Sequence, residues 1–183
     1  MKVIIVGMIA IFGLQFQICS QEEHSPYAGQ EHRQIKALSE SQIKQFFNGA
    51  GMGFAKAAEL NHFPGPKHVL ELAESLQLDD QQIQQTRASF DRMHAAAVKL
   101  GKQIVHSEKE LDDLFKSGTF AADDIAEKVD RIAALKGKLR FTHLNAHLEM
   151  KTILSESQIR QYDDLRGYSR EDGEMEHHQP HHD

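Results

Sequence analysis

Three stretches of nine residues share one pattern and decide the fold: LSESQIKQF (Leu38–Phe46), LDDQQIQQT (Leu78–Thr86) and LSESQIRQY (Leu154–Tyr162). In each stretch, a Ser or Asp is followed three positions later by Gln, which is the spacing of a capping box at a helix start. A Leu comes directly before the cap and an Ile four positions after it, which is the spacing of a hydrophobic staple. The pattern predicts helices that begin just after Ser39, Asp79 and Ser155.

Composition favours a single all-α domain. The chain has 183 residues, of which 40% are hydrophobic, with four Pro and no Trp. Its formal net charge is -6 with His neutral, and the twelve His residues are the compositional outlier. An acidic chain lacks the basic patch with which proteins bind nucleic acids, so we expect no nucleic-acid partner.

The first twenty residues have the pattern of a signal peptide. Lys2 precedes an apolar run over residues 3–16, which is short for a transmembrane helix, and the flank then turns polar. Cys19 is the only cysteine. A lipid anchor on Cys19 is the alternative, but residues 16–18 match a lipobox poorly, and we prefer removal with the signal peptide. A mature chain without Cys19 has no disulfide and no Cys ligand for a metal.

Two long helices dominate the expected architecture, one over about residues 80–116 and one over about 122–153. Apolar residues recur every seven positions in both, which is typical of a coiled-coil seam. The rows are Ile83, Phe90, Ala97, Ile104 and Leu111, with Met93, Leu100 and Leu114 beside them, and Ile125, Ile132, Leu139, Ala146 and Ile153, with Val129 and Leu135. The short connection predicts a long antiparallel helical hairpin. Each arm would span roughly 45 to 55 Å, so its apolar face needs shorter helices or a second subunit to cover it.

Shorter elements flank these helices. We expect helices over about residues 39–48, 54–60, 66–76 and 156–166, with Pro66 at a first helical position. Residues 21–37 are predicted to be a flexible leader. Residues 169–183 are predicted to be a disordered tail rich in His.

The order of these elements resembles the Spy/CpxP family of periplasmic proteins, whose signature is Leu-Thr-x-x-Gln, with Ser or Asp here in place of Thr. The stretch GMGFAKAAELNHFPGPKHVLELAESLQL, Gly51–Leu78, is similar to a subgroup of refolding chaperones or heavy-metal sensors. The resemblance covers roughly residues 38–166, within a helical domain that we expect over residues 38–168. It implies a cradle-like homodimer in the periplasm that binds unfolded or envelope clients without ATP, or a metal sensor or buffer with a membrane sensor partner.

A client surface would lie between the hairpin and residues 51–78. We expect exposed Met52, Phe54 and Phe63 to provide apolar contacts, and Lys56 and Lys67 to provide electrostatic contacts. The alternative is that these residues pack the short helices onto the hairpin.

A metal site is the second functional hypothesis. His143 and His147 are four residues apart and share one helix face, with Met150 close behind. Antiparallel pairing places His94 level with Asn145, between the two histidines. Such a set could bind zinc, nickel, cobalt or copper. The alternative is that the histidines are polar residues beside the seam and Met150 is a core residue. The tail offers a second set, His177, His178, His181 and His182, which could chelate a metal without any fold.

Enzymatic activity is not expected. The sequence has no nucleophile elbow, and the glycines at positions 49, 51 and 53 are not followed by the Lys-Ser/Thr of a phosphate-binding loop. No cofactor is required by this interpretation, apart from a possible transition metal.

Overall fold

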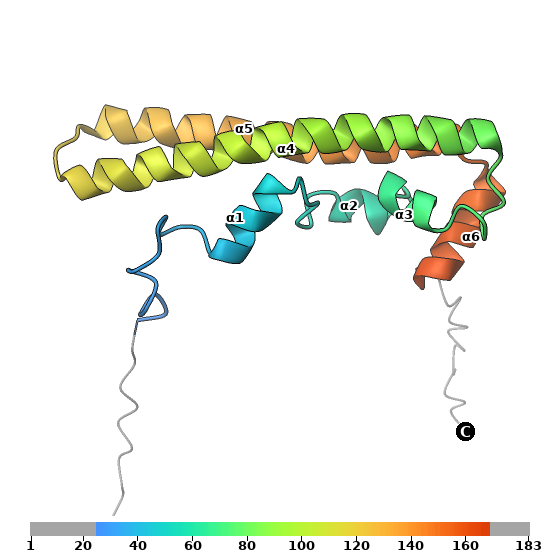
Figure 1. Ribbon diagram of the computed structural model, residues 1–183, viewed down its shortest axis with the longest axis horizontal. Coiled ribbons are helices and arrows are strands. Elements are labelled where there is room, and N and C mark those ends of the chain that lie inside the picture. The colour runs from blue at the N-terminus through green and yellow to red at the C-terminus, as the bar shows by residue number, and fades with distance from the viewer. Residues whose placement is uncertain (1–24, 169–183) are drawn as a thin grey trace, which may run out of the picture. The chain divides into compact units, whose positions relative to one another are not determined.

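The computed structural model describes residues 25–168, and all the regular structure in this range is helical (Figure 1). The helices are α1 (Glu40–Phe47), α2 (Lys56–Glu59), α3 (Pro66–Glu71), α4 (Asp80–Ser117), α5 (Ala122–Ile153) and α6 (Glu156–Arg166). The predictions of an all-α fold and of two long helices are confirmed. The predicted signal peptide, Cys19 and the His-rich tail lie outside the described residues.

Residues 25–32 belong to a separate unit and consist of turns, in which the Ala28 and Gln30 amides donate to the Ser25 and Tyr27 carbonyls. The second unit begins at Arg33 and contains the helices. Between residues 25 and 168, no helix combines the length and hydrophobicity needed to cross a membrane.

The three predicted capping boxes are all present. Ser39, Asp79 and Ser155 accept hydrogen bonds from the backbone N–H of Gln42, Gln82 and Gln158, whose side chains accept from the backbone N–H of the cap residues. Each box satisfies two N–H groups that a helix start leaves without a partner. This local chemistry fixes where α1, α4 and α6 begin.

The long helices α4 and α5 lie side by side over most of their length (Figure 1). Ion pairs join Arg92 to Glu149 at 2.8 Å and Glu108 to Lys136 at 2.7 Å, so positions further along α4 meet earlier positions on α5. Residues 118–121 connect the helices, and Gly118 adopts a left-handed conformation with φ 67°. Ile132, Leu139 and Ala146 of the predicted seam are buried.

Two members of the predicted apolar rows lie outside the packed seam. Ile83 is 36% exposed in the first turn of α4, and Val129 is 47% exposed on α5. Ile83 was also expected to pack as a staple against Leu78. Leu38 with Ile43, and Leu154 with Ile159, do share apolar clusters as predicted.

The second and third copies of the motif contact each other directly. The Gln82 side-chain amide donates to Gln158 Oε1 at 2.8 Å, and the Gln158 amide donates back to Gln82 Oε1 at 3.0 Å. The same amide nitrogens also donate to the carbonyls of Ile153 and Leu76. This pair joins the starts of α4 and α6.

Two apolar clusters hold the helices together. One lies where α1 and residues 35–38 cover α4 and α5, and its members include Phe46, Ala97, Ile104 and Leu139. The other lies where α3 and α6 meet the end of α5. It contains Val69, Leu76, Met150, Leu154, Ile159 and Tyr162.

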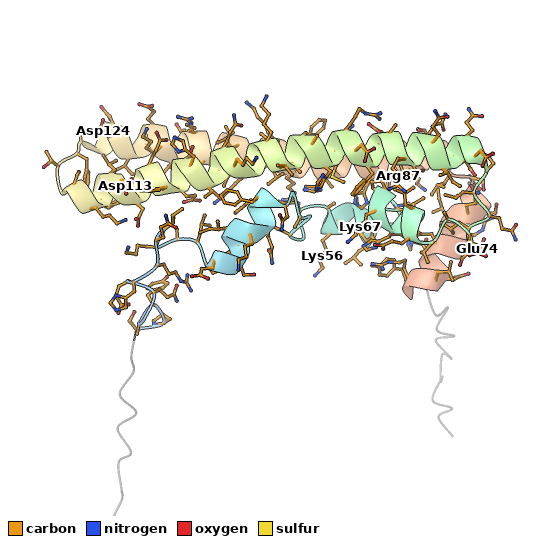
Figure 2. The ribbon with its side chains drawn as sticks, in the orientation of Figure 1. Lys56, Lys67, Glu74, Arg87, Asp113 and Asp124 are labelled. Atoms are coloured by element: carbon orange, nitrogen blue, oxygen red, sulfur yellow. The ribbon has the colours of Figure 1, made fainter. Side chains whose placement is uncertain are left out.

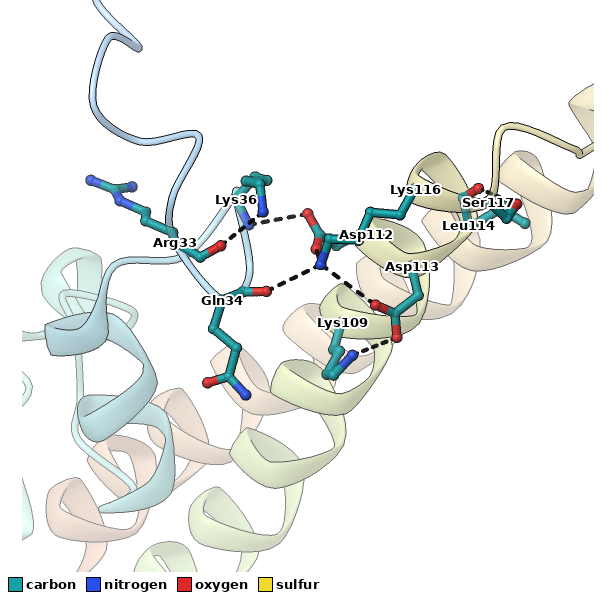
Figure 3. Close-up of polar contacts among 9 residues, drawn as sticks. All are labelled: Arg33, Gln34, Lys36, Lys109, Asp112, Asp113, Leu114, Lys116 and Ser117. Atoms are coloured by element: carbon teal, nitrogen blue, oxygen red, sulfur yellow. Dashed lines mark hydrogen bonds and ion pairs between the residues drawn. The ribbon is translucent and has the colours of Figure 1, made fainter.

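Residues 33–36 are tied to the end of α4, although the sequence placed them in a flexible leader. The Lys36 backbone N–H donates to Asp112 Oδ1 at 3.2 Å, and Lys116 reaches the Gln34 carbonyl while pairing with Asp112 (Figure 3). Ile35 is buried in the first apolar cluster. Burial opposes ionisation of Asp112, but hydrogen bonds from Lys116 and Lys36 outweigh it and lower the pKa of this carboxyl. The helical unit therefore begins before the first motif.

Helix α1 crosses α4 at Gly101. A Cβ atom built on Gly101 would lie 2.0 Å from the carbonyl oxygen of Phe46, so only glycine permits this approach. Gly137 on α5 is the natural comparison, because a Cβ atom there would meet nothing within 4 Å.

We predict opposite effects for alanine at these two helical glycines. Gly137→Ala should stabilise the protein by up to about 1 kcal/mol, because alanine restricts the unfolded chain. Gly101→Ala should destabilise it by about 1 to 3 kcal/mol, because α1 must shift away from α4. Urea denaturation of both variants measures this difference. Equal stabilisation by the two substitutions would contradict the close packing of α1.

Candidate functional site: a cavity lined by histidines

A cavity of about 710 Å³ lies between residues 48–68 and the two long helices. Its wall on the short-helix side includes the glycines at positions 49, 51 and 53. Its apolar lining includes Met52, Leu60, Phe90 and Met93. The volume falls within the range of about 300–1,000 Å³ that is usual for ligand cavities.

Three of the predicted metal-ligand residues line this cavity: His94 from α4 and His143 and His147 from α5. The structure brings these three together, because α4 and α5 both contribute to the wall of the cavity. Each imidazole nevertheless has a different environment.

His147 holds one end of the cavity wall. Its Nδ1 lies 2.7 Å from the carbonyl oxygen of Phe63. Because a carbonyl can only accept, Nδ1 carries the proton, and Nε2 keeps its lone pair in the neutral ring. A Cβ atom at Gly65 would lie 3.2 Å from Nε2, so glycine leaves room for the imidazole.

His94 contacts the other end of the same wall. Its Nε2 lies 3.1 Å from the carbonyl oxygen of Asn48 and therefore donates to it. The ring stacks on Phe90, with centroids 5.6 Å apart. The two imidazoles thus hold backbone carbonyls at both ends of residues 48–63.

His143 lies deepest of the three. The residue is 5% exposed, its ring stacks on Phe54, and its Nε2 is buried without a hydrogen-bond partner. Burial, followed by the nearby His147 and His94, lowers the pKa of His143. The ring is therefore neutral at pH 7.

Met150 does not join the histidines. It is fully buried in the cluster of α3, α5 and α6, where it packs with Val69 and Tyr162. Within residues 25–168, no group of three or more His, Cys, Asp or Glu side chains is arranged to hold a metal ion. His177, His178, His181 and His182 lie outside the described residues.

The expected client-contact residues divide into two groups. Lys56 and Lys67 are exposed and line the cavity, as does the half-buried Met52. The expectation that Phe54 and Phe63 are exposed is wrong, because Phe54 packs against the first apolar cluster and Phe63 lies beneath Lys151, 5.1 Å from its Nζ.

A carboxylate that no sequence pattern indicated, Glu59, lies at the edge of the cavity. Glu59 accepts a hydrogen bond of 2.6 Å from the Tyr162 hydroxyl and lies 3.6 Å from both Arg166 Nε and His147 Nδ1. Burial and the contact with Glu59 raise the pKa of Tyr162, which stays protonated as the donor. His62 contacts Asp163 at 2.8 Å beside this group. No local pattern marks these residues, since α2 and α6 are about 100 positions apart.

Comparison with protein-family models, with curated proteins and with solved structures gives no match to this chain.

Proposed function

We propose that this protein is an ATP-independent, chaperone-like stress protein that binds unfolded or envelope proteins at the cavity. The observation that carries the proposal is the cavity of about 710 Å³ between residues 48–68 and the long helices. It lies where the sequence placed the client surface. In this proposal the pair of long helices forms an antiparallel hairpin, and two copies of the chain form the cradle implied by the Spy/CpxP resemblance.

The lining suits clients of varied sequence. Met52 and Met93 have flexible, polarizable side chains that adapt to differently shaped apolar groups. Glycines at positions 49, 51 and 53 make one wall from backbone, so little side-chain volume obstructs the entrance. Lys56 and Lys67 add cationic contacts at exposed positions. An unfolded segment could therefore place apolar side chains in the cavity and acidic ones beside it.

Gly51 offers a way to fill the cavity without strain. A Cβ atom there would meet nothing within 4 Å, and the backbone does not have a positive φ. Gly51→Trp should lower the suppression of aggregation of a chemically denatured client several-fold, because the indole occupies client space. Light scattering at substoichiometric to equimolar protein measures this effect.

The matched control is Gly137→Trp, since Gly137 also has open space around its Cβ position but lies outside the cavity lining. This variant should suppress aggregation as the wild type does. The proposal fails if the wild type has no effect on aggregation even in excess, or if the two Trp variants behave alike.

A metal sensor or buffer is the second candidate, and the buried Nε2 of His143 favours it. His147 donates Nδ1–H to a backbone carbonyl, as metal-bound histidines commonly do. The residues fit a metal only after rearrangement, because no ligand group is assembled in residues 25–168. His143, His147 and His94 would be the cavity ligands, with the tail histidines as a second set.

Zinc or nickel titration separates the two sets of ligands. We predict that His143→Ala combined with His147→Ala lowers the affinity of the full chain at least about tenfold, since two ligands are lost. Deletion of residues 171–183 removes the four tail histidines and should leave metal binding by the cavity histidines unchanged. Unchanged affinity in the double variant would eliminate the cavity site.

A further inference from the structure

We propose that residues 169–183 dock in the cavity of the same molecule and shield it from external ligands. The first support is the point at which the chain leaves the helical unit. Arg166 and Tyr168 both line the cavity, so the tail starts at its edge. Fifteen residues can extend over roughly 50 Å, which is ample to cross the opening.

The second support is charge complementarity. Three cationic residues line the cavity, Lys56, Lys67 and Arg166, against one carboxylate, Glu59. That carboxylate is already engaged by Tyr162 and Arg166. The cavity lining therefore carries more positive than negative side chains, although the whole chain has a formal net charge of -6.

The tail has the opposite charge. Its acidic residues are Glu171, Asp172, Glu174, Glu176 and Asp183, and its only Arg or Lys is Arg170. Met175 is its one large apolar residue and stands between two Glu, so it can enter an apolar lining while its neighbours meet lysines. An unfolded client would use the same combination, with apolar side chains in the cavity and acidic side chains beside it.

The cavity lysines are available to such a partner. Lys56 makes no ion pair within residues 25–168, and Lys67 makes one with Glu71 at 3.8 Å, in which both side chains are more than half exposed. Exposed pairs of this kind are worth little and exchange readily. Figure 2 shows both lysines on the segment of α2 and α3.

Tethering makes the docking effective even when each contact is weak. A segment joined to the edge of its own site is present at a millimolar effective concentration. An external ligand must therefore displace the tail. The acidic residues of the tail determine how strongly the tail competes with that ligand. Tail docking depends on the cavity and its charges but not on client binding, so it can be tested without a client.

Thiol labelling of the full chain tests the proposal. Gly51→Cys places a thiol at the cavity wall, and Gly137→Cys places one on α5 outside it, with Cys19→Ser so that each probe is the only thiol. The tail is then neutralised by Glu→Gln and Asp→Asn at its five acidic positions. We expect maleimide to react about three- to tenfold faster at position 51 after neutralisation, and equally fast at position 137. Raising the salt to 1 M should accelerate labelling of the wild-type tail in the same way.

A second tail variant keeps the acidic residues and replaces its four histidines with Asn. With chelator present, it should protect position 51 as the wild-type tail does. Equal labelling of position 51 with native and neutralised tails would overturn the proposal, as would acceleration at both probe positions. Protection that grows with protein concentration would also overturn it, because the tail of a second copy would then be the occupant.

Discussion

The hydrogen bonds between Gln82 and Gln158 are the constraint on which the rest of the structure depends. Each glutamine already closes the capping box of its own helix, and its amide nitrogen then reaches the other glutamine. The contact fixes the start of α6 against the start of α4. From this position α6 directs Tyr162 and Arg166 toward Glu59 on α2, and Asp163 toward His62. The cavity wall is therefore held by a helix that begins at the amide pair.

The histidines have two roles in this arrangement. His94 and His147 donate to backbone carbonyls at Asn48 and Phe63, and so hold the wall at both ends. Their remaining nitrogens and the unpartnered Nε2 of His143 are the groups that could bind a ligand. A metal or client that engages these imidazoles would act on the residues that hold the cavity wall. This arrangement gives client binding and metal binding a shared physical basis in the two proposals.

The sequence predicted those parts of the fold that depend on local chemistry. The starts of α1, α4 and α6 follow from Ser39, Asp79 and Ser155, because a capping box involves only four consecutive residues. His94, His143 and His147 line one cavity. The sequence placed them near one another by assuming that two long helices with a short connection pair antiparallel. The sequence left Met150 open between the histidines and the core, because its burial depends on α3 and α6 packing over the end of α5.

Contacts between distant elements could not be read in the same way. Glu59 and Tyr162 are joined only after α2 and α6 pack on the long helices. Gln82 and Gln158 do stand out in the sequence, because each occupies the same position of a repeated motif. Helix capping already explains a Gln at that position, so the motif does not predict the hydrogen bonds between the two side chains. Gln42 shows the difficulty, because it closes its box like the others, yet within residues 25–168 its side chain makes no hydrogen bond to another helix. The close approach at Gly101 was likewise hidden, since a glycine inside a helix indicates no particular neighbour.

The most direct test of this account is a double-mutant cycle on Gln82 and Gln158. Each Gln→Ala variant loses its own capping contact, and the cycle on the free energy of unfolding isolates the interaction between the two amides. We predict a coupling energy of about 1 to 2 kcal/mol, as expected for reciprocal, partly buried hydrogen bonds. The matching cycle on Gln42 and Gln158 should give a value near zero. A coupling energy near zero for Gln82 and Gln158 would contradict the claim that this pair holds α6 and the cavity wall in place.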